Sequence, residues 1–569
     1  MKESLSKIIY KSLCELYPQV ENIPDENTIL EFIEVPPNKE MGDYAFPCFR
    51  LSKALKKSPQ LIAEELAKHI VDESSEAKSL GGYLNFFLQR ENFAKKTIEE
   101  LGKKGENYGA STMGKGKTIC LDYSSINIAK RFHIGHLSTT MIGNSLNRIF
   151  KFLGYNTVAI NHLGDWGTQF GKLIYAYKEW GNKDKLEKDG VDELTDLYVK
   201  YHDEAEKDPS LDDKGRAWFK AIEDGDEEAL ELFDWFKRLT LRDSQVVYDM
   251  LDVHFDSYAG ESFYNDKMDR VIEELKAKNL LTISDGASVV NLDEYDMPPC
   301  LILKKDGASL YATRDIAAVL YRHDTYNFDK CLYVVAYQQD LHFKQVFKVV
   351  ELMGYDFAKD LKHVSFGMIS YEGQMLATRK GHVVYLEDLL NKACEKALDI
   401  IDQKSPDLPD KENIARQVGI GAVIYTDLQN NRIKDIDFRW ERALNFDGET
   451  GPYVQYTHAR CCSVLRKAED IDFSNPDFSA LCDDWAQSLL LLISRLPENI
   501  VQAAEKYEPS IITRAMTDIA KAYNKYYYEQ RIITDDNDAT AARLLLTKGT
   551  KDVLKTAMYL IGMEAPERM

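Results

Sequence analysis

The sequence has no long apolar run. Its longest apolar stretches, such as residues 489–493, are far shorter than the roughly 20 residues that a membrane-spanning helix needs. The N-terminal segment alternates charged and apolar residues, so it lacks the continuous apolar core of a signal peptide. Glu3 and Glu15 are atypical of an organelle transit peptide. We therefore expect a cytoplasmic protein that makes no use of a membrane.

Cysteine pairs with metal-binding or redox spacing are also missing. The chain has nine cysteines and no C-x-x-C pair; Cys461 and Cys462 are adjacent, and the others are scattered singly. This pattern fits neither a disulfide framework nor a four-ligand zinc site. We expect reduced core cysteines and no structural metal.

The sequence also lacks an excess of basic residues. The formal net charge is -21, from 72 Lys and Arg against 93 Asp and Glu. The field of so acidic a chain repels phosphates, so any contact with nucleic acid requires Lys and Arg gathered on one face. Nucleic-acid binding is thereby restricted to a local surface.

The texture of the sequence predicts an α/β protein of several domains. A chain of 569 residues is longer than a single hydrophobic core usually organises. Residues 1–108 read as a small α/β domain. A Gly- and Lys-rich stretch from Gly102 to Lys117, which overlaps the end of this domain, reads as a linker. Residues 117–384 alternate strand and helix patterns, which predicts a Rossmann-type domain with a parallel sheet and a charged helical insertion at about 175–245. Residues 385–569 show helical periodicity and predict an α-helical bundle.

One segment of the second region has the pattern of a β-α-β unit. Residues 118–123 read as a buried strand, 137–153 as an amphipathic helix that ends at Gly154, and 157–160 as a second strand. The loop 124–131 connects the first strand to the helix. Ligands of such sheets bind at the carboxyl ends of the strands, where helix N-termini direct amide groups at anions.

A tetrapeptide at the start of that helix suits phosphate chemistry. His133 and His136 are three residues apart, Gly135 between them leaves room for a phosphate or a base, and Lys130 adds a charge. Taken alone, the tetrapeptide could equally cap a helix by chance. A metal site is less well supported, because no cysteine or third histidine lies close by. The position after the first strand of a β-α-β unit favours a nucleotide site.

Several motifs resemble those of the class I arginyl-tRNA synthetases, in order and along nearly the full length. They lie at 42–44, 122–136, 161–171, 311–315, 333–342, 448–460 and 566–569. The resemblance implies an arginine–tRNA ligase with ATP and Mg²⁺ as co-substrates. Such an enzyme activates L-arginine to arginyl-adenylate and transfers it to the 3′ terminal adenosine of tRNA(Arg). The resemblance also implies that Lys130, His133, Gly135 and His136 bind ATP and act in catalysis.

The sequence departs from the family pattern at two points. Ile126 stands where the family usually has proline, which would make the loop less rigid. The second class I motif, ideally KMSKS, is MLATRKG at 375–381 and lacks its first lysine. The resemblance gives that role to Lys130, with Thr378 at ATP and with Arg379 and Lys380 neutralising the pyrophosphate. A basic surface loop is the alternative for this stretch.

A guanidinium pocket needs planar acceptors, and a carboxylate accepts two parallel N–H bonds from it. By resemblance, Tyr311 and Asp315 hold the arginine side chain, Asp122 adds negative charge, and Asn127 and Gln339 bind the α-amino group. The full set expected to bind arginine is Asp122, Ser124, Asn127, His133, Tyr311, Asp315 and Gln339. A strand end followed by a helix N-cap is the alternative for Tyr311 and Asp315. Lysine would be rejected, since one ammonium cannot satisfy acceptors shaped for a fork.

Aromatic and basic residues alternate in two C-terminal stretches, near 453–467 and 523–531. Such clusters can stack on unpaired bases and neutralise phosphates, although core tyrosines with solvated charges are the commoner origin. The resemblance favours RNA, because the family's helical domain binds the anticodon and its N-terminal domain the tRNA elbow. The tRNA-binding residues expected here are Tyr453, Tyr456, Arg460 and Tyr527. We expect a monomer.

Three other readings are less well supported. A cysteinyl enzyme needs metal-ligand cysteines, and a glutamine pocket does not need two carboxylates. A non-catalytic RNA-binding paralogue would explain the incomplete second motif but not the intact Lys130, His133, His136 and Asp315. A small-substrate nucleotidyltransferase would be shorter and would have no long helical domain.

Overall fold

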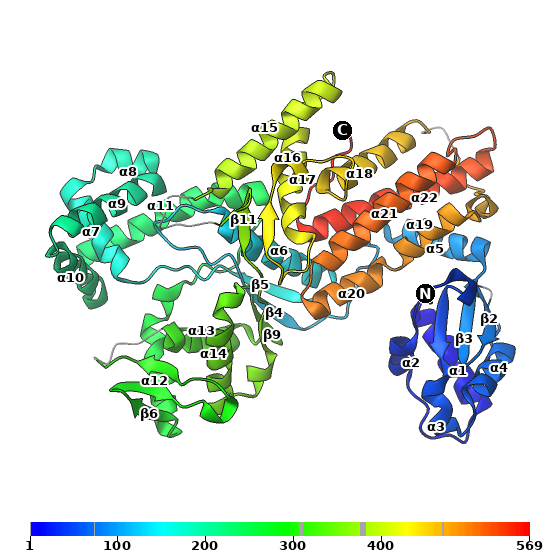
Figure 1. Ribbon diagram of the computed structural model, residues 1–569, viewed down its shortest axis with the longest axis horizontal. Helices are drawn as coiled ribbons and strands as arrows, with labels where there is room; N and C mark the ends of the chain where they lie inside the picture. Colours follow the sequence, from blue (N-terminus) through cyan, green and yellow to red (C-terminus); the bar gives the residue numbers. More distant parts are fainter. Residues whose placement is uncertain (1, 73, 306–310, 376–382, 469–471) are drawn as a thin grey trace. The chain divides into compact units, whose positions relative to one another are not determined.

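The computed structural model describes residues 2–72, 74–305, 311–375, 383–468 and 472–569 (Figure 1). The chain forms two compact units, each made of three segments. One comprises Met1–Tyr108, Arg460–Glu498 and Asp518–Thr556, and the other Gly109–Ala459, Asn499–Thr517 and Ala557–Met569.

A small antiparallel sheet lies at the centre of the N-terminal region. Its strand order is β1-β3-β2, with bounds Tyr44–Pro47, Tyr83–Leu88 and Ser75–Leu80. The covering helices are α1 (Lys2–Leu16), α2 (Glu26–Phe32), α3 (Ser52–Leu55) and α4 (Pro59–His69). Ser58 caps α4, and Pro59 stands in its first turn. The predicted α/β character is confirmed, but the predicted linker begins too early, because α5 (Arg90–Lys104) buries Ile98 and Leu101 and continues through Lys104.

A parallel sheet organises the second unit, as predicted. Its order is β10-β9-β4-β5, with bounds Leu361–His363, Lys330–Tyr333, Thr118–Asp122 and Asn156–Ile160. Asp122 pairs in register with Tyr333 on one side and with Ile160 on the other, so three strands end level. Helix α6 (Leu137–Phe152) follows β4, and Gly154 has the positive φ of 85° predicted for its C-terminus. Helices α13 (Tyr311–Tyr326) and α14 (Asp340–Leu352) flank β9 along the chain.

The charged stretch after β5 is helical (Figure 1). It contains α7 (Thr168–Trp180), α8 (Lys183–Asp189), α9 (Val191–Lys207), α10 (Leu211–Asp224) and α11 (Glu227–Leu251). Tyr175, Leu197 and Tyr201 form part of a separate small core between these helices. These helices therefore pack through an apolar face and keep their charges on the other.

Two minor sheets complete this unit. The antiparallel sheet β6-β7-β8 (Leu281–Ser284, Ala287–Val290 and Cys300–Leu303) follows α12 (Met268–Ala277). The second sheet has the order β12-β11-β13, with bounds Gln374–Met375, Ile369–Tyr371 and Ile436–Phe438. Strand β13 comes from the region predicted to be helical and pairs in parallel with β11. A strand of three residues is too short for its periodicity to be read from sequence.

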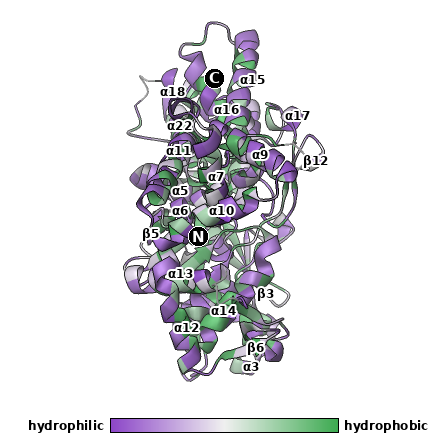
Figure 2. Cartoon of the chain, turned by 90° about the vertical axis from the view of Figure 1, so that its left-hand side faces the viewer, coloured by the Kyte–Doolittle hydropathy of each residue, from purple (hydrophilic) through white to green (hydrophobic). Residues whose placement is uncertain are grey.

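The C-terminal region is otherwise helical, as predicted. Its helices are α15 (Leu386–Lys404), α16 (Lys411–Leu428), α17 (Trp440–Ala443), α18 (Gly451–Arg466), α19 (Asp484–Ser494), α20 (Leu496–Lys506), α21 (Ser510–Glu529) and α22 (Asn537–Ile561). Figure 2 shows hydrophilic and hydrophobic residues interleaved along most helices, as amphipathic packing requires. All nine cysteines are free thiols, six buried and three half-buried. Within the described ranges, no helix has the length and apolar character to cross a membrane.

Candidate active site

The candidate site lies at the carboxyl ends of β4, β5 and β9. The backbone N–H of Val334 donates to the carbonyl of Asp122 at 2.8 Å, and that of Tyr123 donates to Ile160 at 3.0 Å. The sheet therefore continues by hydrogen bonds one residue past its strands, and the loops that leave it start from a fixed edge. This is the edge at which parallel α/β sheets bind ligands.

The loop after β4 is held in an unfavourable backbone conformation. Ser124, Ser125 and Ala129 have φ values of 69°, 48° and 61°, in the left-handed region that such residues seldom adopt. Backbone bonds with Gly164 at 2.9 and 3.1 Å fix the middle of the loop. A Cβ on Gly164 would lie 2.3 Å from Oδ1 of Asn127, so a larger residue at 164 would displace the Asn127 side chain. The loop is thus tied down although Ile126 replaces the family's proline.

The two histidines of the tetrapeptide lie together at the start of α6. Their ring centroids are 4.0 Å apart. The N–H of Gly135 donates to Nδ1 of His133 at 3.1 Å, and the N–H of His133 donates to Nδ1 of His136 at 3.4 Å. Because both Nδ1 atoms accept, each neutral ring carries its proton on Nε2. The pair therefore offers two N–H donors.

Burial keeps both imidazoles uncharged. Burial, with smaller effects of the neighbouring His133 and Lys130, lowers the pKa of His136 to about 3. Burial followed by the charge of Lys130 also lowers the pKa of His133. Lys130 itself is exposed. The positive charge at this position thus comes from Lys130, while the histidines contribute hydrogen-bond donors.

The chain just beyond the second motif is bound to the tetrapeptide. Ile134 donates its backbone N–H to Val384 at 2.9 Å, and Leu386 donates to Phe132 at 2.9 Å. Arg131 lies over the ring of Tyr385, 3.8 Å from its centroid. The histidine tetrapeptide at 133–136 and residues 384–386, which follow the second class I motif, are therefore adjacent. The predicted residues Thr378, Arg379 and Lys380 lie outside the described residues.

A chain of charged side chains crosses the strand ends. Nη2 of Arg322 lies 2.8 Å from Oδ2 of Asp122, and Ser125 donates to the other oxygen at 2.9 Å. The same Nη2 lies 3.3 Å from Nδ1 of His162. Nε2 of His162 is 3.9 Å from Oδ1 of Asp315, whose Oδ2 is 2.5 Å from Nε2 of His342. Asp122 and Asp315 were both predicted as site residues from the sequence. They are connected through Arg322 and His162, which were not predicted.

The two carboxylates differ in what they can offer a ligand. Asp122 is buried and already bonded by Arg322 and Ser125. Burial tends to raise the pKa of Asp315, but the hydrogen bond and charge of His342, with further charge from Arg322, hold it below its usual value. Asp315 is consequently a partly accessible, ionised carboxylate. Nearby, burial raises the pKa of Glu261 to about 7, with Asp315 adding repulsion and Arg314 opposing it.

The remaining predicted arginine-binding residues occupy different environments. Asn127, Gln339 and Tyr311 are exposed. Ser124 is buried, and its hydroxyl is engaged by Tyr248 at 2.8 Å and by Thr140 at 3.0 Å, so its side chain supports the loop. Asp315 is the fifth residue of α13, which rules out the alternative that it is an N-cap.

Sequence reasoning did not single out His162, Arg322 and His342. The two histidines stand within quoted motifs, at 161–171 and 333–342, where a pairing with Asp315 could have been suspected. Arg322 follows Asp315 by seven residues on α13, two helical turns along the same face. Nothing in the sequence indicates that it reaches Asp122, because that contact spans two hundred residues of chain.

The predicted tRNA-binding clusters divide by burial. Tyr456 and Tyr527 are exposed and Tyr453 is half-buried, whereas Gln455, His458, Tyr523 and Tyr526 are in the core. The Arg460 guanidinium lies 5.2 Å from the Tyr527 ring centroid. A cavity of about 400 Å³ is lined by Arg460, Ser463, Val464, Lys467, Tyr527, Gln530, Arg531, Ile532 and Ile533. The lining of this cavity therefore combines basic groups with the ring of Tyr527.

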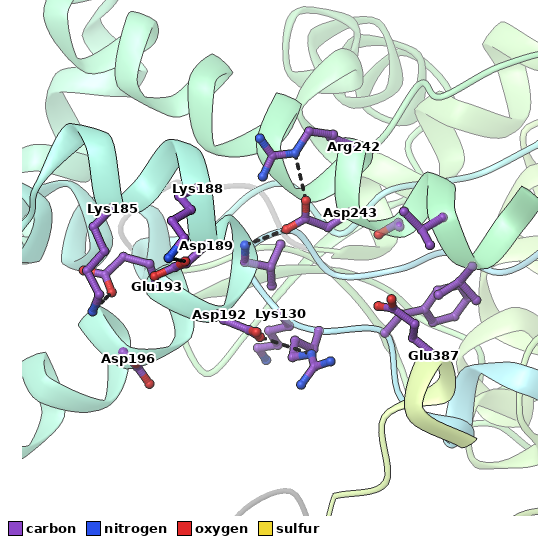
Figure 3. Close-up of a pocket in the computed structure, with 16 residues that line it drawn as sticks. Lys130, Lys185, Lys188, Asp189, Asp192, Glu193, Asp196, Arg242, Asp243 and Glu387 are labelled. Atoms are coloured by element: carbon purple, nitrogen blue, oxygen red, sulfur yellow. Dashed lines mark hydrogen bonds and ion pairs between the residues drawn. The ribbon is translucent and has the colours of Figure 1, made fainter. Parts of the chain in front are cut away.

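A larger cavity of about 520 Å³ lies beside residues 130–132, just before the histidine tetrapeptide, and beside the helices that follow β5 (Figure 3). Lys130 and Arg131 line it, together with charged residues of α8, α9 and α11. Arg131 pairs with Asp192 at 3.1 Å, and Arg242 pairs with Asp243 at 2.9 Å. The lining thus carries both signs of charge, largely paired with each other. In the part of the chain that the structure describes, no cluster of His, Cys, Asp or Glu is arranged to hold a metal ion.

Comparisons with known families cover almost the whole chain. Residues 2–88 match the arginyl tRNA synthetase N terminal domain, 97–440 the catalytic domain of class I (R) tRNA synthetases, and 454–569 the DALR anticodon binding domain. The chain is 55% identical to the arginine–tRNA ligase of Alkaliphilus metalliredigens, over 97% of its length and 98% of the relative's. It is 54% identical to that of Clostridioides difficile, with the same coverage.

The fold is similar to solved structures over their full lengths. Arginyl-tRNA synthetase from Thermus thermophilus superposes with a TM-score of 0.84 at 25% identity, covering all of both chains. Arginyl-tRNA synthetase from Plasmodium falciparum gives a TM-score of 0.82 at 24% identity, covering all of this chain and 99% of the other. The second match bears on the fold alone.

Proposed function

The chain belongs to the arginyl-tRNA synthetase family, and from that premise we propose how its residues carry out arginine–tRNA ligation. The enzyme activates L-arginine with ATP and transfers it to the 3′ terminal adenosine of tRNA(Arg). The observation that carries the residue assignment is the common edge of β4, β5 and β9. The histidine pair follows β4 there, and the Asp122-to-Asp315 chain of charges crosses the same edge.

Asp315 is the carboxylate that binds the arginine guanidinium in this proposal. It is ionised and partly accessible, whereas Asp122 is neutralised by Arg322. Tyr311, one turn before Asp315 on α13, packs against the aliphatic part of the substrate. Asn127 and Gln339 bind the α-amino group, and His133 contacts the carboxylate. A carboxylate fixed in place matches the fork of a guanidinium better than the single ammonium of lysine.

Activation requires positioning and charge stabilisation more than covalent chemistry. A carboxylate oxygen of arginine forms a bond to the α-phosphorus of ATP while the bond to the bridging oxygen breaks, which releases pyrophosphate. The Nε2–H groups of His133 and His136 donate to phosphate oxygens, and Lys130 supplies positive charge, with Thr378, Arg379 and Lys380 completing the set. Mg²⁺ arrives with ATP as part of the substrate, where phosphate oxygens are its ligands.

Transfer to tRNA uses the second half of the chain in this proposal. A ribose hydroxyl of the terminal adenosine attacks the acyl carbon, and AMP leaves. Residues 385–569 hold the anticodon through Tyr453, Tyr456, Arg460 and Tyr527, and residues 1–108 contact the tRNA elbow. The catalytic region 117–384 with its insertion at about 175–245 stays a prediction, as do a monomeric state and a cytoplasmic location.

Aminoacylation assays test the proposed substrate. We expect the purified chain to charge tRNA(Arg) with radiolabelled L-arginine in the presence of ATP and Mg²⁺, and to leave it uncharged with L-lysine. Charging with another amino acid, or tRNA binding without charging, would contradict the proposal.

A further inference from the structure

We propose that Arg131 is a positioning residue for ATP, whose guanidinium holds Tyr385 and the start of α15 against the histidine tetrapeptide. The inference rests on the proposed roles of Lys130, His133 and His136 at the ATP phosphates. It assigns a role to Arg131, to which the sequence motifs give none. In this role Arg131 fixes the place of those three groups and does not itself contact ATP.

Arg131 contacts side chains at the starts of two helices. Its Cζ lies 3.8 Å from the ring centroid of Tyr385, the residue that precedes α15. Its Nε lies 3.1 Å from Oδ1 of Asp192 in the first turn of α9. Its Nη2 lies 3.5 Å from Oδ1 of Asp388 in the first turn of α15. One side chain thus joins the loop after β4 to the starts of α9 and α15.

The ring of Tyr385 is the main partner of the guanidinium. The two carboxylates are exposed, Asp192 at 57% and Asp388 at 62%, and ion pairs of that exposure contribute little. Arg131 itself is only 25% exposed and Tyr385 is half-buried, so their contact is partly desolvated, which strengthens a cation over an aromatic face. The carboxylates therefore orient the guanidinium, and the ring holds it.

This contact acts on the same two segments that the backbone joins. His133 and Tyr385 form an antiparallel bridge, with Ile134 donating to Val384 and Leu386 donating to Phe132, each at 2.9 Å. Arg131 stands immediately before this bridge and extends it by a side-chain contact. Without that contact, residues 130–134 are held less firmly against α15. A displacement of about 1 Å in groups that bind a reacting phosphate can cost about a hundredfold in rate.

The neighbouring cation is better placed to bind a phosphate. Lys130 and Arg131 line the same cavity (Figure 3). The charge of Arg131 is compensated by two carboxylates and its face is covered by Tyr385. Lys130 is exposed and forms no ion pair with any residue that the structure describes. Arg131 would have to break three contacts to reach ATP, so it positions and Lys130 binds.

Steady-state aminoacylation by the full chain at varied ATP tests this role. Arg131→Met keeps the aliphatic stem and removes the guanidinium, so we expect the KM for ATP to rise about tenfold, the effect of one partly desolvated cation–π contact. The KM for tRNA(Arg) should be little changed. Arg131→Lys keeps a cation over the ring and should stay within about threefold of wild type.

Variants of Tyr385 separate positioning from direct contact with ATP. Tyr385→Leu removes the ring and should raise the KM for ATP about tenfold, whereas Tyr385→Phe keeps the ring and should resemble wild type. The double variant of Arg131→Met with Tyr385→Leu should show about the same tenfold rise, because both changes remove one contact. Independent effects would instead multiply to about a hundredfold. That multiplication, or a rise in Arg131→Met that Tyr385→Leu does not share, would overturn the inference.

Arg242→Met is the matched control. Arg242 lines the same cavity and pairs with Asp243 at 2.9 Å, but both residues belong to α11. Its loss should leave the KM for ATP unchanged, and the midpoint of urea unfolding should be the same for Arg131→Met and wild type. An equal rise in Arg242→Met, or no rise in Arg131→Met, would contradict the role of Arg131.

Lys130→Met distinguishes failure of this inference from failure of the proposed ATP site. If Lys130→Met impairs the use of ATP while Arg131→Met does not, only the role of Arg131 fails. If Lys130→Met and His136→Ala both use ATP like wild type, the ATP site is wrongly assigned and the inference fails with it.

Discussion

Nη2 of Arg322 lies 2.8 Å from Oδ2 of Asp122, and the Arg322 side chain is only 1% exposed. An internal guanidinium therefore occupies a carboxylate that was expected from the sequence to add negative charge to the arginine pocket. In the proposed function the arginine guanidinium binds Asp315, which lies 3.9 Å from His162, and His162 in turn contacts Arg322. The proposal thus assigns one carboxylate to structure and the other to the ligand.

Replacing Arg322 should destabilise the fold. Arg322→Met removes the cation and leaves Asp122 buried without a counter-charge, which we expect to cost about 3–5 kcal/mol of unfolding free energy. Urea unfolding followed by circular dichroism measures the loss. The double variant Arg322→Met with Asp122→Asn should recover part of it. A single variant as stable as wild type would show that the pair is not a buried counter-charge.

Removing the charge of Asp315 should impair arginine recognition specifically. Asp315→Asn loses a charged, two-point acceptor, so kcat/KM for arginine should fall about 10²–10³-fold, with the KM for ATP little changed. Asp340→Asn is the control, since Asp340 lies on α14 and pairs with His363. An equal loss in both variants would point to general damage of this region.

His136→Ala should lower kcat by about 10²–10³, the effect of losing one transition-state donor. Steady-state aminoacylation measures it, with the exposed His254→Ala as control. Because burial lowers the pKa of His136 to about 3, His136 should remain neutral and contribute no inflection to kcat between pH 5 and pH 8. A normal kcat in His136→Ala would remove the role assigned to this donor.

A buried carboxyl beside the first turn of α6 should make stability depend on pH. Asp427 of α16 is 4% exposed and accepts from Ser138 at 2.5 Å. Burial raises its pKa to about 7, against the hydrogen bond from Ser138. The unfolded chain loses this proton near pH 4, so the folded state holds the extra proton between about pH 4 and pH 7. The contribution of the Asp427 carboxyl to the free energy of unfolding is therefore fully present below pH 4 and is lost as the pH rises through 7.

Asp427→Asn removes that titration and can still accept from Ser138. We expect the variant to gain roughly 2–4 kcal/mol over wild type at pH 8 and to approach it toward pH 4. Chemical unfolding at several pH values measures the difference. A difference that did not change with pH would mean that Asp427 is ionised in the folded protein throughout.

Tyr527→Ala should weaken the binding of tRNA without affecting the fold. The exposed ring, with Arg460 nearby, is available to a base, and base stacking contributes about 1–3 kcal/mol. The KM for tRNA should rise by roughly 5- to 150-fold, while the KM for arginine stays unchanged. Tyr526→Phe is the control, because Tyr526 is in the core of the same helix. Equal tRNA binding by Tyr527→Ala and wild type would exclude Tyr527 from the interface.

The features that could be predicted from the sequence were those with a local signal. The β-α-β unit from Thr118 to Ile160 follows from apolar periodicity and from Gly154, which acts within a few residues. The strand β13 (Ile436–Phe438) could not be predicted, because its partner lies more than sixty residues earlier. The same limit applies to Arg322, whose role depends on a carboxylate two hundred residues away.

Motif resemblance names candidate residues but does not describe their surroundings. Asp122 and Ser124 stand at the predicted edge, but the structure shows both engaged by other side chains. Likewise, Gln455 and Tyr523 belong to the predicted RNA-binding clusters and are fully buried. Which face of a helix is covered depends on the rest of the fold. A short motif therefore does not show which of its residues will be buried.

The most direct test of arginine activation is ATP–pyrophosphate exchange, run with and without tRNA(Arg). Family resemblance predicts exchange with arginine that depends on the RNA, no exchange with lysine, and a loss in Asp315→Asn and His136→Ala. No exchange under any condition, with tRNA still bound, would contradict the catalytic account and favour a non-catalytic RNA-binding member of the family.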